Sequence, residues 1–128
     1  MTRILLVEDS DDILYILQLE LNWMGYVVDI AANADEAIEL AKKNRPDVIV
    51  SDLQMPVVDG LEFIKHIRRI PTLANVPAIA LTGFSLEIKI QQALSSGFTA
   101  HLTKPVEATQ LAKLIEQLTA VRLKRKAS

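Results

Sequence analysis

Short apolar runs with little polar alternation constrain the fold of this chain more than any other feature. A strand that is apolar throughout is buried on both faces, as in parallel sheets covered by helices on both sides. Segments with helical spacing separate these runs, so strands and helices alternate along the chain. The segments predicted as strands are residues 3–7, 26–31, 48–51, 78–81 and 100–103.

Helical spacing and capping residues mark the segments between the strands. The first predicted helix, residues 11–24, ends at Gly25, a residue suited to a left-handed cap. Asn33 is predicted to cap the second helix, with Glu36 completing a capping box, and further helices are expected near residues 61–70, 85–96 and from about residue 107. The apolar stripe assigned to the core side of the first helix consists of Ile13, Ile16, Leu17, Leu21 and Met24.

Five strand–helix alternations predict an α/β fold with a doubly wound parallel sheet and helices on both faces. Periodicity does not reveal strand order. Five strands nevertheless fit the flavodoxin-like order 2-1-3-4-5, whose switch point lies between strands one and three. Ligands of such sheets bind at the carboxyl ends of the strands near this point.

Composition excludes several classes of protein. The 128 residues fit one domain, the net charge of −2 does not indicate a nucleic-acid-binding surface, and the lack of cysteine excludes thiolate metal sites and cysteine nucleophiles. No apolar stretch approaches the roughly 18 residues of a membrane span. The N-terminal residues do not form a signal peptide, so we expect a cytoplasmic protein with neither membrane nor direct nucleic-acid binding.

Five polar residues stand where the apolar runs stop: Glu8, Asp9, Asp52, Thr82 and Lys104. Taken singly, each of them could serve as a cap or a solvated residue. Together they lie at one end of four predicted parallel strands, and the order 2-1-3-4-5 makes the three acids neighbours. The shared placement therefore predicts one site.

Three crowded carboxylates repel one another unless a proton or a cation intervenes. Magnesium suits hard oxygen ligands and commonly binds one or two carboxylates together with phosphate, and manganese could substitute for it. A lysine and a threonine at adjacent strand ends supply the charge and the hydroxyl that a phosphoryl group needs. Asp52, on the central strand, is the best candidate for a carboxylate nucleophile.

Four fragments in this order carry a resemblance to a known family. They are Ile4-Leu-Leu-Val-Glu-Asp-Ser10, Asp52-Leu-Gln-Met-Pro-Val-Val-Asp-Gly60, Ala80-Leu-Thr82 and Leu102-Thr-Lys-Pro105. The set resembles the receiver domain of two-component response regulators, from Arg3 to about Leu118. The predicted receiver domain spans residues 1–121, and residues 122–128 form a basic tail or linker.

The resemblance implies a role for each residue of the site. Asp52 would accept a phosphoryl group from a phosphohistidine, with Asp9 as a direct magnesium ligand and Glu8 acting through water. Gln54 would offer its backbone carbonyl to the metal. Lys104, Thr82 and Gly83 would bind the phosphoryl group. Gly83, directly after Thr82, would leave the site open to water and small phosphodonors.

The resemblance also implies a switch. The hydroxyl of Thr82 would move toward the phosphoryl group and let the side chain at position 101 turn inward. That residue is His101, whose side chain is smaller than that of tyrosine. Pro105 would follow a cis peptide bond that helps to aim Lys104.

Expected partners follow from the same resemblance. The donor would be a sensor histidine kinase or a histidine phosphotransfer protein, docking on a face of the first helix formed by Leu14, Tyr15 and Gln18. The protein would be a phosphoryl acceptor and signalling switch rather than an enzyme. Its downstream protein partner is unknown, and it could be a freestanding regulator or part of a hybrid sensor kinase.

Rival interpretations differ at particular residues. A phosphatase of the haloacid dehalogenase type would need an acid at position 54, where this chain has Gln54. A flavodoxin-like cofactor binder would need a phosphate-binding loop after the first strand, where the chain is acidic. A pseudo-receiver acting only as an interaction module would not need the full acceptor set.

Overall fold

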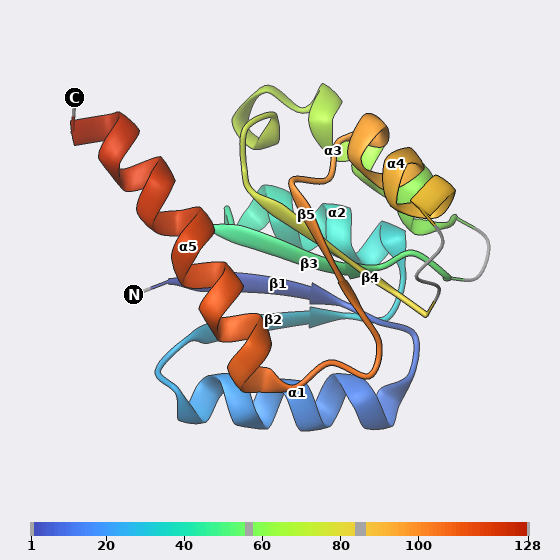
Figure 1. Cartoon of the computed structure of the whole chain (residues 1–128), viewed down its shortest axis with the longest axis vertical. Helices are drawn as coiled ribbons and strands as arrows, with labels where there is room; N and C mark the ends of the chain where they lie inside the picture. Colours follow the sequence, from blue (N-terminus) through green and yellow to red (C-terminus); the bar gives the residue numbers. More distant parts are fainter. Residues whose placement is uncertain (1, 56–57, 84–86, 128) are drawn as a thin grey trace.

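The computed structural model describes residues 2–55, 58–83 and 87–127 and contains one five-stranded parallel sheet (Figure 1). Its strand order, β2-β1-β3-β4-β5, and the parallel pairing of all neighbours confirm the predicted flavodoxin-like topology. Residues 56 and 57, part of the fragment Asp52–Gly60 that carries the family resemblance, lie outside the described residues. The strands are β1 (Arg3–Val7), β2 (Val27–Ala31), β3 (Val48–Asp52), β4 (Ala78–Thr82) and β5 (Ala100–Thr103).

Helices cover both faces of the sheet (Figure 1). One face packs against α1 and α5, and the other packs against α2, α3 and α4. Right-handed crossovers from each strand to the next produce this division when the strand order reverses at β1. The helices are α1 (Asp11–Trp23), α2 (Ala34–Lys43), α3 (Gly60–Arg69), the short 3-10 helix η1 (Pro71–Leu73), α4 (Glu87–Ser96) and α5 (Ala108–Ala127).

Alternating strand residues divide the core into two layers. Ile4, Leu6 and Val50 belong to the layer under α1 and α5, whereas Leu5 and Ile49 belong to the layer under α2, α3 and α4. Side chains point to opposite faces along a strand, so a strand in the middle of the sheet must be apolar at every position. This explains why β1, β3 and β4 lack polar alternation.

Local signals set the ends of several helices as predicted. The side chain of Asn33 accepts a hydrogen bond from the backbone N–H of Glu36 at 2.9 Å, and the Glu36 carboxylate accepts one from the N–H of Ala32 at 3.0 Å. Gly25 and Gly97 follow α1 and α4 with positive φ angles of 100° and 130°, a backbone region that favours glycine. These caps direct the chain into β2 and β5.

The predicted core stripe of α1 is wrong in part. The buried residues of this helix are Leu14, Leu17 and Leu21, whereas Ile13 and Ile16 are exposed. Met24, just beyond the helix, is also exposed. Apolar residues occur on several sides of α1, so two stripes satisfy the helical period equally well, and only packing against the sheet selects between them.

Within the described residues, no helix is both long and apolar enough to cross a membrane.

Candidate phosphoryl-transfer site

Strand register brings the predicted site residues together at the carboxyl edge of the sheet. Val7 of β1 pairs with Ser51 of β3, so Glu8 and Asp52 follow at the same level. Thr82, at the end of β4, pairs with Thr103 of β5, and Lys104 comes next in the chain. The backbone N–H of Lys104 donates to the carbonyl of Thr82 at 2.8 Å, which fixes the start of the loop after β5.

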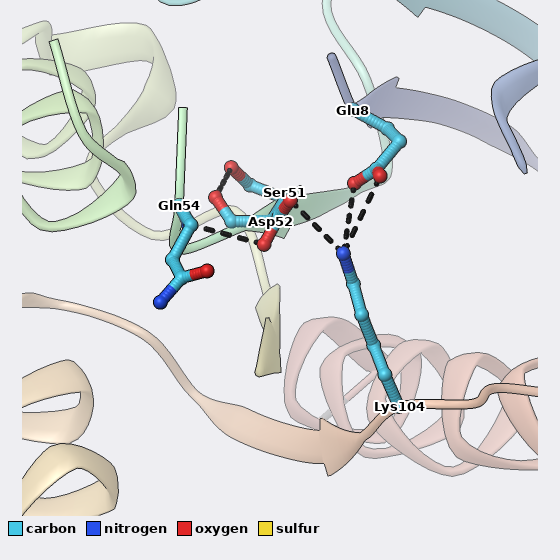
Figure 2. A network of polar contacts seen from close by, with 5 residues as sticks. All are labelled: Glu8, Ser51, Asp52, Gln54 and Lys104. Atoms are coloured by element: carbon cyan, nitrogen blue, oxygen red, sulfur yellow. Dashed lines mark hydrogen bonds and ion pairs between the residues drawn. The ribbon is translucent and has the colours of Figure 1, made fainter. Parts of the chain in front are cut away.

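Lys104 lies between two buried carboxylates (Figure 2). Its Nζ lies 3.0 Å from Oδ2 of Asp52 and 3.3 Å from Oε1 of Glu8. The exposed fractions of Glu8 and Asp52 are 1% and 3%. Because buried charges require compensation, the lysine is a structural partner of both acids.

The second oxygen of the Asp52 carboxylate is also held. Its Oδ1 accepts a hydrogen bond from the backbone N–H of Gln54 at 3.1 Å (Figure 2). The hydroxyl of Ser51 donates a hydrogen bond to the backbone carbonyl of Asp52 at 2.9 Å and so restrains the backbone of Asp52. These bonds fix the direction of the carboxylate toward the edge of the sheet.

The site strongly perturbs the acidity of Glu8. Burial, together with the hydrogen bond and the charge of Asp52, raises the pKa of Glu8 from 4.5 to about 7 despite the opposing effect of Lys104. Burial disfavours the charged form of Lys104, but Asp52 and Glu8 outweigh it and raise the pKa of this lysine. Negative charge is therefore in excess at the site.

The three acids fit a hard cation. Each of Glu8, Asp9 and Asp52 offers a carboxylate oxygen, and these oxygens lie within 4.8 Å of one another. Asp9 is exposed, while the other two are buried, so a cation could reach the group from solvent. Oxygen donors of this kind suit magnesium better than zinc, which prefers nitrogen and sulfur.

A cavity of about 490 Å³ opens beside these acids. Thr82 and Gln54 line it with Asp9, so they lie where the sequence predicts a phosphoryl group to bind. Gly83 is exposed at the end of β4. The peptide bond between Lys104 and Pro105 is cis, as the resemblance implies, and His101 is half-buried in β5 beside Ala80.

Comparison with known proteins agrees with this geometry. Residues 4–116 match the response regulator receiver domain family. The chain belongs to this family. The receiver is 42% identical over 114 residues to an uncharacterised 14.6 kDa protein of Leptolyngbya boryana, covering 89% of this chain and 87% of that protein.

Further relatives include the polar-differentiation response regulator DivK of Brucella anthropi, which is 29% identical with 88% of this chain and 92% of DivK covered. Among solved structures, the chemotaxis protein CheY4 of Vibrio cholerae is 36% identical with a TM-score of 0.89, covering 92% of the receiver and 98% of CheY4. The receiver spans about half the length of other curated relatives, such as the transcriptional regulatory protein AfsQ1 of Streptomyces coelicolor, of which 48% is covered.

One residue of the predicted docking face is misplaced. Leu14 is buried against the sheet, so it is not available to a partner of the receiver. Tyr15 is 61% exposed and Gln18 is half-buried. The exposed apolar surface of α1 instead includes Ile13 and Ile16, two residues of the predicted core stripe.

Gly60 has a role at the site that its place in the sequence fragment Asp52–Gly60 does not reveal. A Cβ at this position would lie 2.5 Å from the carbonyl oxygen of Asp52 and 2.7 Å from Cα of Leu53. The backbone N–H of Gly60 donates to the carbonyl of Leu53 at 2.9 Å. The start of α3 thus packs directly on the backbone that carries Asp52, and no side chain fits between them.

We expect Gly60→Ala to lower the free energy of unfolding by about 3 kcal/mol, because the new methyl group collides with backbone atoms that cannot rotate away. Urea denaturation measures this change. Gly83→Ala is the matched control, since a Cβ there meets nothing within 4 Å. The control should shift stability by less than about 0.5 kcal/mol. Equal stability of Gly60→Ala and the wild-type receiver would contradict the close packing.

Proposed function

We propose that this receiver is the phosphoacceptor of a two-component phosphorelay, with Asp52 as the residue that is phosphorylated. The observation that carries the proposal is the Asp52 carboxylate itself. It is buried at the sheet edge, held by the N–H of Gln54 and by Lys104, and set beside two further acids. The match to the receiver family over residues 4–116 supports the same role.

The proposed chemistry is one nucleophilic displacement. A carboxylate oxygen of Asp52 attacks the phosphorus of a phosphohistidine or an acyl phosphate, and the bond from phosphorus to the donor's leaving atom breaks. The leaving group takes the bonding electron pair, and an aspartyl phosphate remains. Lys104, 3.0 Å from the Asp52 carboxylate, is near enough to pair with the incoming phosphoryl oxygens, and the hydroxyl of Thr82 would donate to them.

Glu8, Asp9 and Asp52 are the residues that would hold magnesium, with the backbone carbonyl of Gln54 as a further oxygen ligand and manganese as a substitute. A bound cation would offset the excess negative charge at the site and the charge of the phosphoryl group. The receiver domain of the sensor histidine kinase PA1611 of Pseudomonas aeruginosa, 30% identical with a TM-score of 0.86 and with 93% of this chain and 98% of that domain covered, has magnesium in its active site cleft. That similarity supports the assignment.

The aspartyl phosphate would act as a switch and not as an intermediate of turnover. Thr82 and His101 lie on neighbouring strands β4 and β5, so a movement of the threonine toward the phosphoryl group would reach the surface around His101. The protein is in this proposal a cytoplasmic phosphoryl acceptor that assists its own phosphorylation and dephosphorylation, and its output is contact with another protein.

Stoichiometry tests the proposal against a phosphatase of the haloacid dehalogenase type. Incubation with acetyl phosphate and magnesium should give one phosphoryl group per chain, and that group should be lost again after the donor is removed. Sustained release of phosphate from many phosphate esters, without an accumulated adduct, would favour the phosphatase. Gln54 stands where such a phosphatase needs a second acid, which supports the receiver.

The phosphodonor protein is proposed to dock on α1 next to the site. A groove of about 510 Å³ runs between Ile13 and Ile16 of α1 and the loop that carries Lys104, Pro105 and Val106. It is an apolar surface that ends at the lysine of the site. A helical histidine phosphotransfer domain lying along α1 would bring its phosphohistidine to Asp52.

Replacing Tyr15 and Ile16 together by glutamate should slow transfer from the cognate phosphohistidine protein at least about tenfold, because two exposed apolar contacts are lost. Phosphorylation by acetyl phosphate should keep its rate, since neither residue belongs to the acid cluster. The control is Leu94→Glu, which alters an equally apolar exposed residue on α4. Unchanged transfer from the phosphohistidine protein, or an equal loss in Leu94→Glu, would contradict the docking face. Equal slowing with both donors would instead indicate damage to the fold.

A further inference from the structure

A second lysine, Lys89, lies on the wall of the cavity beside the phosphoryl-transfer site. The cavity of about 490 Å³ is lined by Asp9, Gln54 and Thr82 and also by Lys89, which lies in the first turn of α4. A water molecule occupies about 30 Å³ in the liquid. The cavity therefore has room for a small organic phosphate and not only for the transferred group.

Lys104 and Lys89 differ in whether their charges are already paired with carboxylates. Lys104 is bound to the buried carboxylates of Asp52 and Glu8. Lys89 is exposed, and within residues 2–55, 58–83 and 87–127 it forms no ion pair. Its charge is thus available to an anion that enters from solvent.

The other charged residues on the cavity wall are acidic, so an anion in the cavity needs a positive charge nearby. Asp9 and Asp59 also line the cavity. The Asp59 carboxylate caps α3 by accepting a hydrogen bond from the backbone N–H of Glu62. Both carboxylates repel an incoming anion. An acyl phosphate that enters the cavity therefore meets two negative charges, and Lys89 supplies a positive charge on the same wall.

We propose that Lys89 is a positioning residue for small anionic phosphodonors: it holds an acyl phosphate such as acetyl phosphate in the cavity while Asp52 attacks. The inference rests on the proposed phosphoacceptor function. It goes further in naming acyl phosphates as the small donors that the cavity binds. Lys89 does not take part in bond making. The phosphorus–oxygen bond to acetate breaks, acetate leaves with the electron pair, and the aspartyl phosphate forms at Asp52.

Phosphorylation rates at increasing acetyl phosphate, in saturating magnesium, test the inference. For Lys89→Gln, we expect the half-saturating donor concentration to rise about 1.5-fold to fivefold, the range of an exposed ion pair, with little change in the saturating rate. Lys89→Arg should restore the wild-type value because it keeps the charge. The difference should shrink as salt rises, since exposed charges are screened.

Lys113→Gln is the matched control, because it removes an exposed lysine from α5, away from the cavity. Unchanged donor dependence of Lys89→Gln, an equal effect of Lys113→Gln, or failure of Lys89→Arg to restore the wild-type value would overturn the role of Lys89.

Binding of beryllium trifluoride separates this inference from the proposed function. A wild-type protein that binds beryllium trifluoride with magnesium, seen as NMR shifts at Asp52, but is not phosphorylated by acetyl phosphate keeps the phosphoacceptor site and overturns the role of Lys89. Failure of both reactions overturns the proposed function together with the inference.

Discussion

Asp52→Asn should abolish phosphorylation, slowing it at least about a thousandfold with acetyl phosphate or a phosphohistidine protein, because the amide cannot serve as the nucleophile. The substitution keeps the size of the side chain and its acceptor for the N–H of Gln54. Mass analysis of the intact protein measures the adduct directly.

The fold of this variant should survive, since asparagine removes one of two buried negative charges that compete for Lys104. The melting temperature without metal provides the control for folding. A phosphoryl adduct of wild-type yield on Asp52→Asn would contradict the assignment of the nucleophile.

Lys104→Met should cost about 2 kcal/mol of unfolding free energy at pH 8 without metal, because it leaves the buried carboxylates of Glu8 and Asp52 without their cation. We place the value below that of a fully buried ion pair because the lysine side chain is 28% exposed. Urea denaturation at several pH values measures the loss.

The sign of the pH dependence follows from Glu8. The pKa of this carboxyl is about 7 in the folded protein and near 4.5 when unfolded, so the folded state binds the extra proton between these values. Its ionisation costs stability as pH rises through this window. Removing Lys104 takes away an influence that lowers this pKa. The stability difference between Lys104→Met and wild type should therefore be smaller at pH 5, where the pair with Asp52 alone is lost, and largest above pH 7.

The double variant Lys104→Met with Glu8→Gln is the matched control. It removes one of the two unpaired charges and should recover about half of the lost stability at pH 8. The single variant Glu8→Gln should itself be more stable than the wild type above pH 7 without metal. A loss for Lys104→Met that is the same at pH 5 and pH 8 would contradict the ion-pair account.

The topology could be predicted because burial acts on every residue of the central strands. An apolar strand such as β3 fits only a sheet covered on both faces, and the alternation with helices then makes the sheet parallel. The same topology places Glu8 and Asp52 at one edge through the pairing of Val7 with Ser51. The sequence alone therefore predicts that the acids lie side by side.

The orientation of α1 was not predictable in the same way. Leu14 and Ile16 are both apolar and both fit a helical stripe, yet only Leu14 packs on the sheet. The pattern within one helix carries no information about which side meets the strands. An exposed apolar surface on a helix resembles a core stripe in the sequence. The prediction therefore exchanged the two sides of α1 and placed Leu14 on the docking face.

Two contacts made by the helices over the sheet also could not be predicted from the sequence. The approach of Gly60 to the Asp52 backbone and the position of Lys89 on the cavity wall depend on how α3 and α4 sit over the sheet. Neither residue belongs to an apolar stripe or directly follows a strand. Only the packing of the helices brings them to the site.

The most direct test of the account is the location of the phosphoryl group after incubation with acetyl phosphate and magnesium. Reduction with borohydride converts an aspartyl phosphate to homoserine, which peptide mass analysis assigns to one position. If Asp52 is the phosphoacceptor, homoserine should be found at residue 52 alone and only when magnesium is present. Homoserine at another aspartate, or a stable phosphoryl group on Ser51 or Thr82, would contradict it.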